Sequence, residues 1–147
     1  MDKTKVMDAL HRLGFQLTEY PDFGYVFRYE GLNVFLYFDG DDNEFIRMTL
    51  PCIFEGNDDN RIFLLDLVNE ANIKLRYAKI VLRDNEVWVH FETDIYSEPE
   101  MEQILQHGIL SLQAAHLYFG RLVNGQEDLM SFEPANEPES MDSEEEI

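Results

Sequence analysis

The chain has few basic residues, a single cysteine and no long apolar run, and each shortage excludes a class of protein. Its 11 lysines and arginines face 30 acidic residues, so the formal net charge is -19. A negative charge of this size repels phosphate and anionic lipid, which argues against nucleic-acid and membrane-surface binding. No stretch approaches the ~20 apolar residues of a membrane span, and Asp8 interrupts the first apolar stretch, so we expect neither a transmembrane helix nor a signal peptide.

The shortage of cysteine limits the chemistry further. Cys52 is the only cysteine, which excludes an intramolecular disulfide and a zinc cluster built on several cysteines. This composition fits a reducing compartment, and we expect a cytoplasmic protein. A chain of 147 residues suits one domain with one hydrophobic core.

The acidic residues are concentrated toward the C-terminus. All 11 basic residues precede Asn124, whereas 9 of the 30 acidic residues follow it, which leaves 21 acidic residues in the body. Apolar periodicity also ends at Asn124, and a composition of this kind cannot offset the entropy lost on ordering. We therefore predict one domain over residues 1–123 and an acidic, disordered tail over residues 124–147. We expect deletion of the tail to leave folding nearly intact, and a large destabilisation would instead show that its apolar residues dock on the body: Leu129, Met130 and Phe132.

Periodicity and turn residues predict an α+β fold with an antiparallel sheet. Gly14 can end the first helix, Asn60 can cap the second, and Ser97 with Glu100 matches a capping box for the third. Phe15–Tyr20 is compatible with an extended segment. Aromatic residues on both sides of the first two strands indicate that both sheet faces are at least partly covered. We predict helices over Lys3–Leu13, Asn60–Leu75 and Ser97–Val123, and strands over Tyr25–Glu30, Leu32–Asp39, Glu44–Leu50, Arg76–Arg83 and Glu86–Ile95.

No metal site is expected. Asp39–Glu44 has acidic or amide side chains at alternating positions, but a calcium loop needs glycine where Glu44 stands and a bidentate acid where Leu50 stands, so a polar hairpin turn is favoured. The four histidines lack the spacing of a helical zinc pair, and His107 and His116 fall on opposite sides of one helix.

Catalysis has no clear candidate either. Cys52 can act as a nucleophile only if a basic partner approaches it in space, and a buried structural thiol is the favoured interpretation. The sequence contains no phosphate-binding glycine loop, dinucleotide fingerprint or nucleophile elbow. We expect no catalytic residue and no cofactor.

The predicted helices carry more apolar residues than one core-facing stripe needs. The last helix has a second stripe opposite its core residues, and the middle helix has apolar residues outside its own stripe. Isolated surface leucines are ordinary, so a partner contact and a bland surface remain equal alternatives. The candidate partner-binding residues are Leu110, Ala114, Leu117, Ile62, Leu65 and Ile73.

The order of elements and three segments, Phe23–Gly31, Leu67–Asn72 and Val87–Glu92, give the chain a family resemblance. It resembles the YbjN-like bacterial sensory transduction regulators over about Thr4 to Val123. The resemblance implies a fold like that of type III secretion chaperones and a regulatory role. Chaperones of that architecture bind extended, partly unfolded segments, commonly as dimers. Asn69 and Asn72 are expected to satisfy backbone groups where the middle helix meets the next strand, in preference to contacting a ligand.

These observations favour a non-enzymatic interaction module, chaperone-like or regulatory, that binds a polypeptide partner or a second copy. The alternative is a sensor that holds a small ligand in a pocket between the aromatic sheet and a helix. An enzyme ranks third, because it requires Cys52 to meet a histidine and an acid in space.

Overall fold

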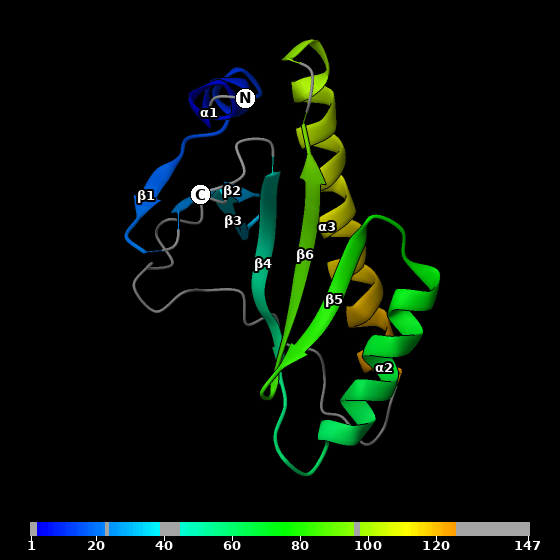
Figure 1. The fold of residues 1–147 in the computed structure, drawn as a ribbon. Coiled ribbons are helices and arrows are strands. Elements are labelled where there is room, and N and C mark those ends of the chain that lie inside the picture. Colours follow the sequence, from blue (N-terminus) through cyan, green and yellow to red (C-terminus); the bar gives the residue numbers. More distant parts are fainter. Residues whose placement is uncertain (1–2, 23, 39–44, 96–97, 126–147) are drawn as a thin grey trace.

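The computed structural model describes residues 3–22, 24–38, 45–95 and 98–125, which form one antiparallel sheet and three helices (Figure 1). The sheet has six strands in the order β1-β2-β3-β4-β6-β5. The α+β prediction is confirmed, and β1 adds a short strand within the segment that the sequence allowed to be extended. The strands are β1 (Thr18–Tyr20), β2 (Gly24–Tyr29), β3 (Leu32–Phe38), β4 (Phe45–Glu55), β5 (Ala78–Arg83) and β6 (Glu86–Asp94); the helices are α1 (Lys3–Arg12), α2 (Arg61–Lys74) and α3 (Met101–Asn124), and a 3-10 turn, η1 (Glu98–Glu100), precedes α3.

Two-residue turns connect β2 to β3 and β5 to β6. Glu30 and Gly31 both have positive φ, 50° and 79°, between β2 and β3. Asp84, with a φ of 55°, opens the turn between β5 and β6. Such turns match the right-handed twist of the paired strands. The predicted strand bounds, which leave Gly31 and Asp84–Asn85 between strands, are therefore confirmed at these two turns.

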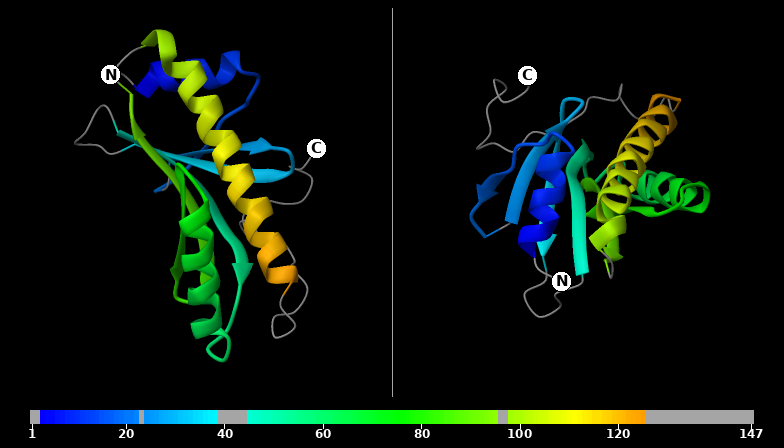
Figure 2. Two further views of the ribbon diagram at one scale, coloured as in Figure 1. Left: turned by 90° about the vertical axis from the view of Figure 1, so that its right-hand side faces the viewer. Right: turned by 90° about the horizontal axis from the view of Figure 1, so that it is seen from above.

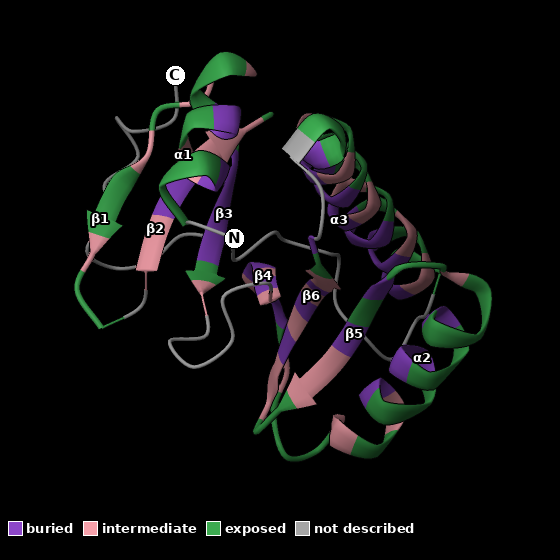
Figure 3. Ribbon diagram, turned by 45° about the horizontal axis from the view of Figure 1, so that its top comes forward, coloured by how far each residue is buried: buried purple, intermediate pink, exposed green. Residues whose placement is uncertain are grey.

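The hydrophobic core lies between the sheet and the three helices, which cover the same face (Figures 2 and 3). Strand register places Leu36 opposite Met48, and Met48 opposite Phe91, so these side chains share the covered face. Each is at most 5% exposed. α3 crosses this face closely at Gly108, where an added Cβ would lie 2.5 Å from Met48 Cε and 2.5 Å from Phe91 Cδ2. Glycine thus sets the spacing between helix and sheet.

A bulge lengthens β4 beyond its predicted end at Leu50. Leu50 pairs with Val89 and Phe54 pairs with Val87, so residues 51–53 stand opposite Trp88 alone. A proline in an inner strand would remove a ladder hydrogen bond, and Pro51 is accommodated because the bulge interrupts the ladder there. Cys52 has a φ of 45° at this point. The strand then resumes and ends at Glu55.

The edge strand β5 is held by a side chain of α2. Asn72 Nδ2 donates to the carbonyl oxygen of Ile80 at 2.8 Å, and the Ile80 N–H donates to Asn72 Oδ1 at 2.9 Å. The amide imitates a neighbouring strand and occupies part of the edge that would otherwise pair with another chain. The prediction for Asn72 is confirmed. Asn69 is exposed, and its predicted role stays a prediction.

The predicted helix caps are only partly correct. Asn60 immediately precedes α2, but its side chain makes no capping bond and instead accepts from the N–H of Asn57 at 2.8 Å. α3 begins at Met101 and not near Ser97, because Glu98–Glu100 forms η1, with Pro99 inside it. Glu100, expected to close a capping box, is itself the N-cap residue and makes no side-chain capping bond. Ser97 lies outside the described residues.

Candidate interaction surfaces

All six predicted partner-binding residues are exposed. Ile62 and Ile73 on α2 are 77% and 72% exposed, and Leu110 and Leu117 on α3 are each 50% exposed. Leu65 is 44% exposed, and Ala114 is also exposed. The contact they were predicted to make stays a prediction.

Spacings of four and three residues place Leu110, Ala114 and Leu117 on one side of α3. We call this side, with its polar ends, the outer stripe of α3. Only Glu102 and Arg121 in this helix carry a formal charge. A protein of net charge -19 thus has a long helix whose outer surface is almost uncharged. The outer stripe consists of Gln103, Gln106, Leu110, Ala114, Leu117 and Arg121.

The sheet face opposite the helices, here called the open face, combines basic and aromatic side chains. The Arg47 guanidinium lies 5.6 Å from the centroid of the Tyr37 ring and 5.8 Å from that of Phe45. Arg83 lies 4.5 Å from the Trp88 ring. These separations suit cation–π attraction. The sequence showed the aromatic residues but not these pairs: Tyr37 and Trp88 lie on strands adjacent to those of Arg47 and Arg83, whereas Phe45 lies two residues from Arg47 on β4 itself.

Glu92 links two basic residues of the open face. It accepts hydrogen bonds from Arg47 Nε at 2.6 Å and from Lys79 Nζ at 3.1 Å. Partial burial opposes ionisation, but the hydrogen bonds from Arg47 and Lys79 outweigh it and lower the pKa of Glu92. Glu92 is therefore an ionised acceptor at neutral pH.

His90 lies at the centre of the open face. Its Nδ1 is 2.8 Å from Thr49 Oγ1, and its ring centroid is 6.3 Å from that of Trp88. Burial, followed by the charge of Arg47, lowers the pKa of His90 to about 4. The ring is consequently neutral at physiological pH and contributes no positive charge to this face.

Cys52 does not have the surroundings of a nucleophile. Burial, together with the charges of Glu86 and Glu55, raises the pKa of Cys52 to about 12. The thiol is therefore protonated at neutral pH, whereas thiol nucleophiles react as thiolates. The favoured structural interpretation fits, although the side chain is half-buried and not fully buried.

The histidines do not converge on a metal. His116 is buried, which lowers its pKa, whereas His107 is exposed with its ring centroid 4.4 Å from that of Tyr77. Across the described ranges, no three His, Cys, Asp or Glu side chains gather as metal ligands do. The acidic loop Asp39–Glu44 that resembled a calcium site lies outside those ranges.

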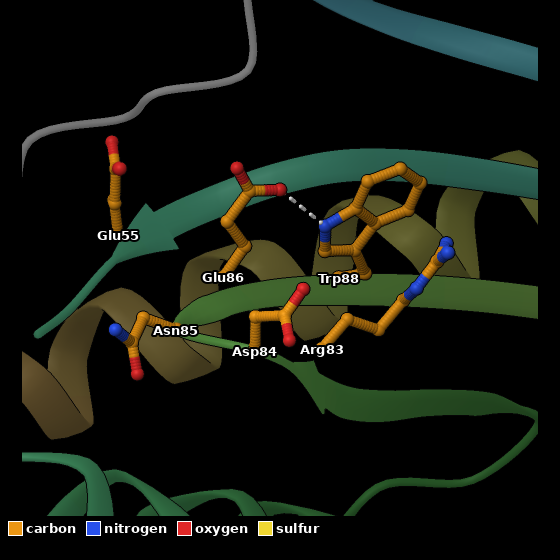
Figure 4. A pocket seen from close by; sticks show the side chains of 6 residues that line it. All are labelled: Glu55, Arg83, Asp84, Asn85, Glu86 and Trp88. Atoms are coloured by element: carbon orange, nitrogen blue, oxygen red, sulfur yellow. Dashed lines mark hydrogen bonds between the residues drawn. The ribbon is translucent and has the colours of Figure 1, made fainter. Parts of the chain in front are cut away.

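Two open surface pockets lie at the margins of the sheet. The first, of about 300 Å³, lies at the β5–β6 hairpin (Figure 4), where Trp88 Nε1 donates to Glu86 Oε1 at 2.9 Å. It is lined by Glu55, Arg83, Asp84, Asn85, Glu86 and Trp88. The second, of about 260 Å³, brings Lys3 of α1 to four aromatic residues and comes closest to the alternative of a ligand between sheet and helix. Its lining is Lys3, Glu19, Tyr20, Asp22, Gly24, Tyr25, Tyr37 and Phe38.

The fold is shared with two solved structures of low sequence identity. The crystal structure of YbjN, "a putative transcription regulator from E. coli", superimposes with a TM-score of 0.64 at 12% identity, covering 80% of this chain and 90% of that one. An uncharacterized protein from Methanothermobacter thermautotrophicus gives a TM-score of 0.55 at 9% identity, covering 83% and 99%. At such identities the likeness concerns the fold alone.

The structural neighbours do not assign the chain to a family at such low identity, and no curated protein sequence matches it. No helix in the described part of the chain is long and apolar enough to cross a lipid bilayer. The YbjN model, whose description is "Putative bacterial sensory transduction regulator", matches residues 2–122, which include every helix and strand described above except the last two residues of α3. The chain therefore belongs to the YbjN family, as its order of elements indicated.

Proposed function

We propose that the protein is a non-enzymatic regulator that acts by binding polypeptide, and that a second copy of the chain binds along the outer stripe of α3. The observation that carries this proposal is an exposed, apolar and nearly uncharged helix surface on a strongly acidic protein. Two copies with a net charge of -19 each repel one another, so they associate most readily where neither presents acidic groups. The outer stripe meets that condition.

The spacing of the outer stripe suits a two-fold contact. In an antiparallel pair of α3 helices, Leu110 of one copy lies near Leu117 of the other, and the small side chain of Ala114 allows close approach between them. Such a contact is self-complementary, as a symmetric dimer requires. A stable interface needs about 800 Å² from each partner, more than three side chains supply. We therefore include Ile62, Leu65 and Ile73 of α2, which packs against α3.

Sedimentation velocity over a range of protein concentrations tests the proposal. We expect a reversible dimer, and we expect Leu110→Glu combined with Leu117→Glu to yield a folded monomer because two carboxylates then enter the interface. Gln16→Glu combined with Thr18→Glu adds the same charge at exposed positions away from α2 and α3 and should leave the dimer intact. A native chain that stays monomeric at all concentrations contradicts the proposal.

The pocket lined by Lys3 and four aromatic residues supports a second candidate, a sensor for a small aromatic ligand. Native mass spectrometry of protein purified without denaturation would detect a retained compound. Lys3→Ala should release that compound if the pocket holds it, whereas Lys74→Ala, an exposed lysine of α2, should not.

A further inference from the structure

Tyr77, in the connection between α2 and β5, has a backbone conformation that aromatic residues rarely adopt. Its φ is 70°, and across it the Ala78 N–H donates to the Arg76 carbonyl oxygen at 2.7 Å. A hydrogen bond between residues two apart, with positive φ at the residue between them, makes a γ-turn of the rare and strained form. Glycine would adopt this φ without the steric cost. The turn itself therefore does not account for a tyrosine at this position.

Burial does not account for the Tyr77 ring either. Its residue is 66% exposed, and the ring makes a T-shaped contact with His107 of α3, with centroids 4.4 Å apart. The His107 ring in turn lies 6.2 Å from that of Phe91, which is 5% exposed. The exposed ring is thus supported from the core through His107. A ring held in this way loses little conformational freedom when a partner covers it, and tyrosine is enriched among the residues that dominate binding energy in protein interfaces.

His107 brings Tyr77 to the edge of the outer stripe of α3. His107 is three residues before Leu110, which places the two side chains on neighbouring parts of the helix surface. Both residues are exposed. Tyr77 therefore extends the exposed apolar surface of α3 toward the turn that follows α2, although it is far from Leu110 in the sequence.

The two-fold contact proposed above places Arg121 of the second copy near Tyr77. His107 is three residues before Leu110, and Arg121 is four residues after Leu117. When Leu110 of one copy lies opposite Leu117 of an antiparallel second copy, His107 comes within one residue of being opposite Arg121. Arg121 is exposed and is the basic residue in the last turn of α3.

We propose that Tyr77 anchors this dimer by packing its ring on the Arg121 guanidinium of the second copy. The proposal rests on the α3 interface proposed above. A guanidinium is attracted to the face of a tyrosine ring, and more strongly when water is excluded. Two-fold symmetry repeats the contact at both ends of the paired stripes and fixes their register. The residues that carry this contact are all described, whereas the tail predicted after Asn124 lies outside the described residues beyond Gly125.

A double-mutant cycle on the full chain tests the contact. Sedimentation equilibrium gives the dimer Kd of the native chain, of Tyr77→Ala, of Arg121→Gln and of the double variant. We expect each single substitution to raise the Kd about tenfold, and the double substitution to raise it by about the same factor, because all three remove the same pair of contacts. Tyr77→Phe keeps the ring face and should keep the Kd within about twofold. Tyr37→Ala and Arg83→Gln make the matched changes on the open face and should leave the Kd unchanged.

A purely structural role for Tyr77 is tested in the Leu110→Glu, Leu117→Glu background, where dimer formation does not contribute to stability. In that background, Tyr77→Gly should not lower the urea midpoint of unfolding, because relief of the positive φ offsets the lost contact with His107. A lowered midpoint together with an unchanged dimer Kd for Tyr77→Ala would show that the ring serves the fold, and would overturn the proposal.

The remaining outcomes separate this contact from the interface on which it rests. A native chain that is monomeric at all concentrations removes the α3 interface and the contact with it. A native dimer whose Kd does not change in Arg121→Gln keeps the interface and overturns the contact alone. So does a double variant whose effect is the product of the two single effects. Arg121 is exposed, so Arg121→Gln provides a test even if Tyr77→Ala fails to fold.

Discussion

The two faces of the sheet differ in what their side chains do. The helix-covered face is built from aliphatic and aromatic residues that are almost fully buried, such as Leu36, Met48 and Val89. The open face carries cation–π pairs, the Glu92 hydrogen bonds and a neutral histidine. One face supplies the burial that stabilises the fold, and the other carries polar and aromatic groups. Substitutions should therefore affect stability very differently on the two faces.

Adjacent residues of β3 provide the most direct comparison. Leu36 is fully buried on the covered face, so Leu36→Ala should lower the free energy of unfolding by about 2–5 kcal/mol through lost burial and a residual cavity. Tyr37 faces the other way and is partly exposed, so Tyr37→Ala should cost less than about 1 kcal/mol. Urea denaturation monitored by circular dichroism measures both. Equal losses would contradict the division into two faces.

Gly108 tests how closely α3 packs on the covered face. Gly108→Ala should destabilise the protein by about 1–3 kcal/mol because the new methyl overlaps Met48 and Phe91, although alanine is the better helix former. Gly125→Ala is the matched control, since its added Cβ meets ordinary contact distances at the end of the same helix. Thermal denaturation distinguishes them. A Gly108→Ala variant that is more stable than the native chain would show that α3 moves away from the sheet without loss of stability.

The edge of the sheet offers a smaller effect. Asn72→Ala removes both hydrogen bonds to Ile80 and should cost about 1–2 kcal/mol, because these backbone groups are partly buried. Asn69→Ala, three residues earlier and exposed on the same helix, should change stability by less than about 0.5 kcal/mol. Amide hydrogen exchange at Ile80 should accelerate only in the Asn72 variant. An unchanged exchange rate of the Ile80 amide in Asn72→Ala would show that Asn72 does not protect this backbone group.

The last comparison concerns pH and the open face. The pKa of His90 falls from about 6.5 to about 4 on folding, so the unfolded chain binds more protons between these values. The contribution of His90 to stability is complete above pH 6.5 and is lost as the pH falls toward 4. The stability difference between the native chain and His90→Gln should therefore shrink across this window. Urea titrations at several pH values measure it, and parallel curves would show that His90 does not titrate differently on folding.

Local patterns predicted most of the elements because their causes are local. Val6 and Leu10 recur at helical spacing and form the buried side of α1. Gly31 and Asp84 mark turns because their backbone must adopt positive φ. The outer stripe of α3 was also visible, since helical spacing alone separates Leu110 and Leu117 from the core.

One prediction failed because a distant strand decided the outcome, and another failed because a competing hydrogen bond formed nearby in the chain. β4 was expected to end at Leu50, but pairing with β6 continues beyond Pro51 because a bulge absorbs the proline. Asn60 was expected to cap α2, but the neighbouring loop offers the N–H of Asn57 to its side chain instead. In β4 the pairing with β6 outweighed the local effect of Pro51, and at Asn60 a local bond within the preceding loop replaced the cap.

By itself the sequence determined the class of fold, the concentration of acidic residues after Asn124 and the surplus of apolar residues on two helices. These follow from periodicity, turn chemistry and charge, which act over a few neighbouring residues. Only the tertiary structure decided that β6 lies between β4 and β5, that Asn72 holds Ile80, and that Arg47 meets both Tyr37 and Phe45. The pairing of β4 with β6 joins residues far apart in the chain, and the other contacts join nearer residues that meet only once their strands and helix are in place, so their free energy appears only when the sheet is assembled.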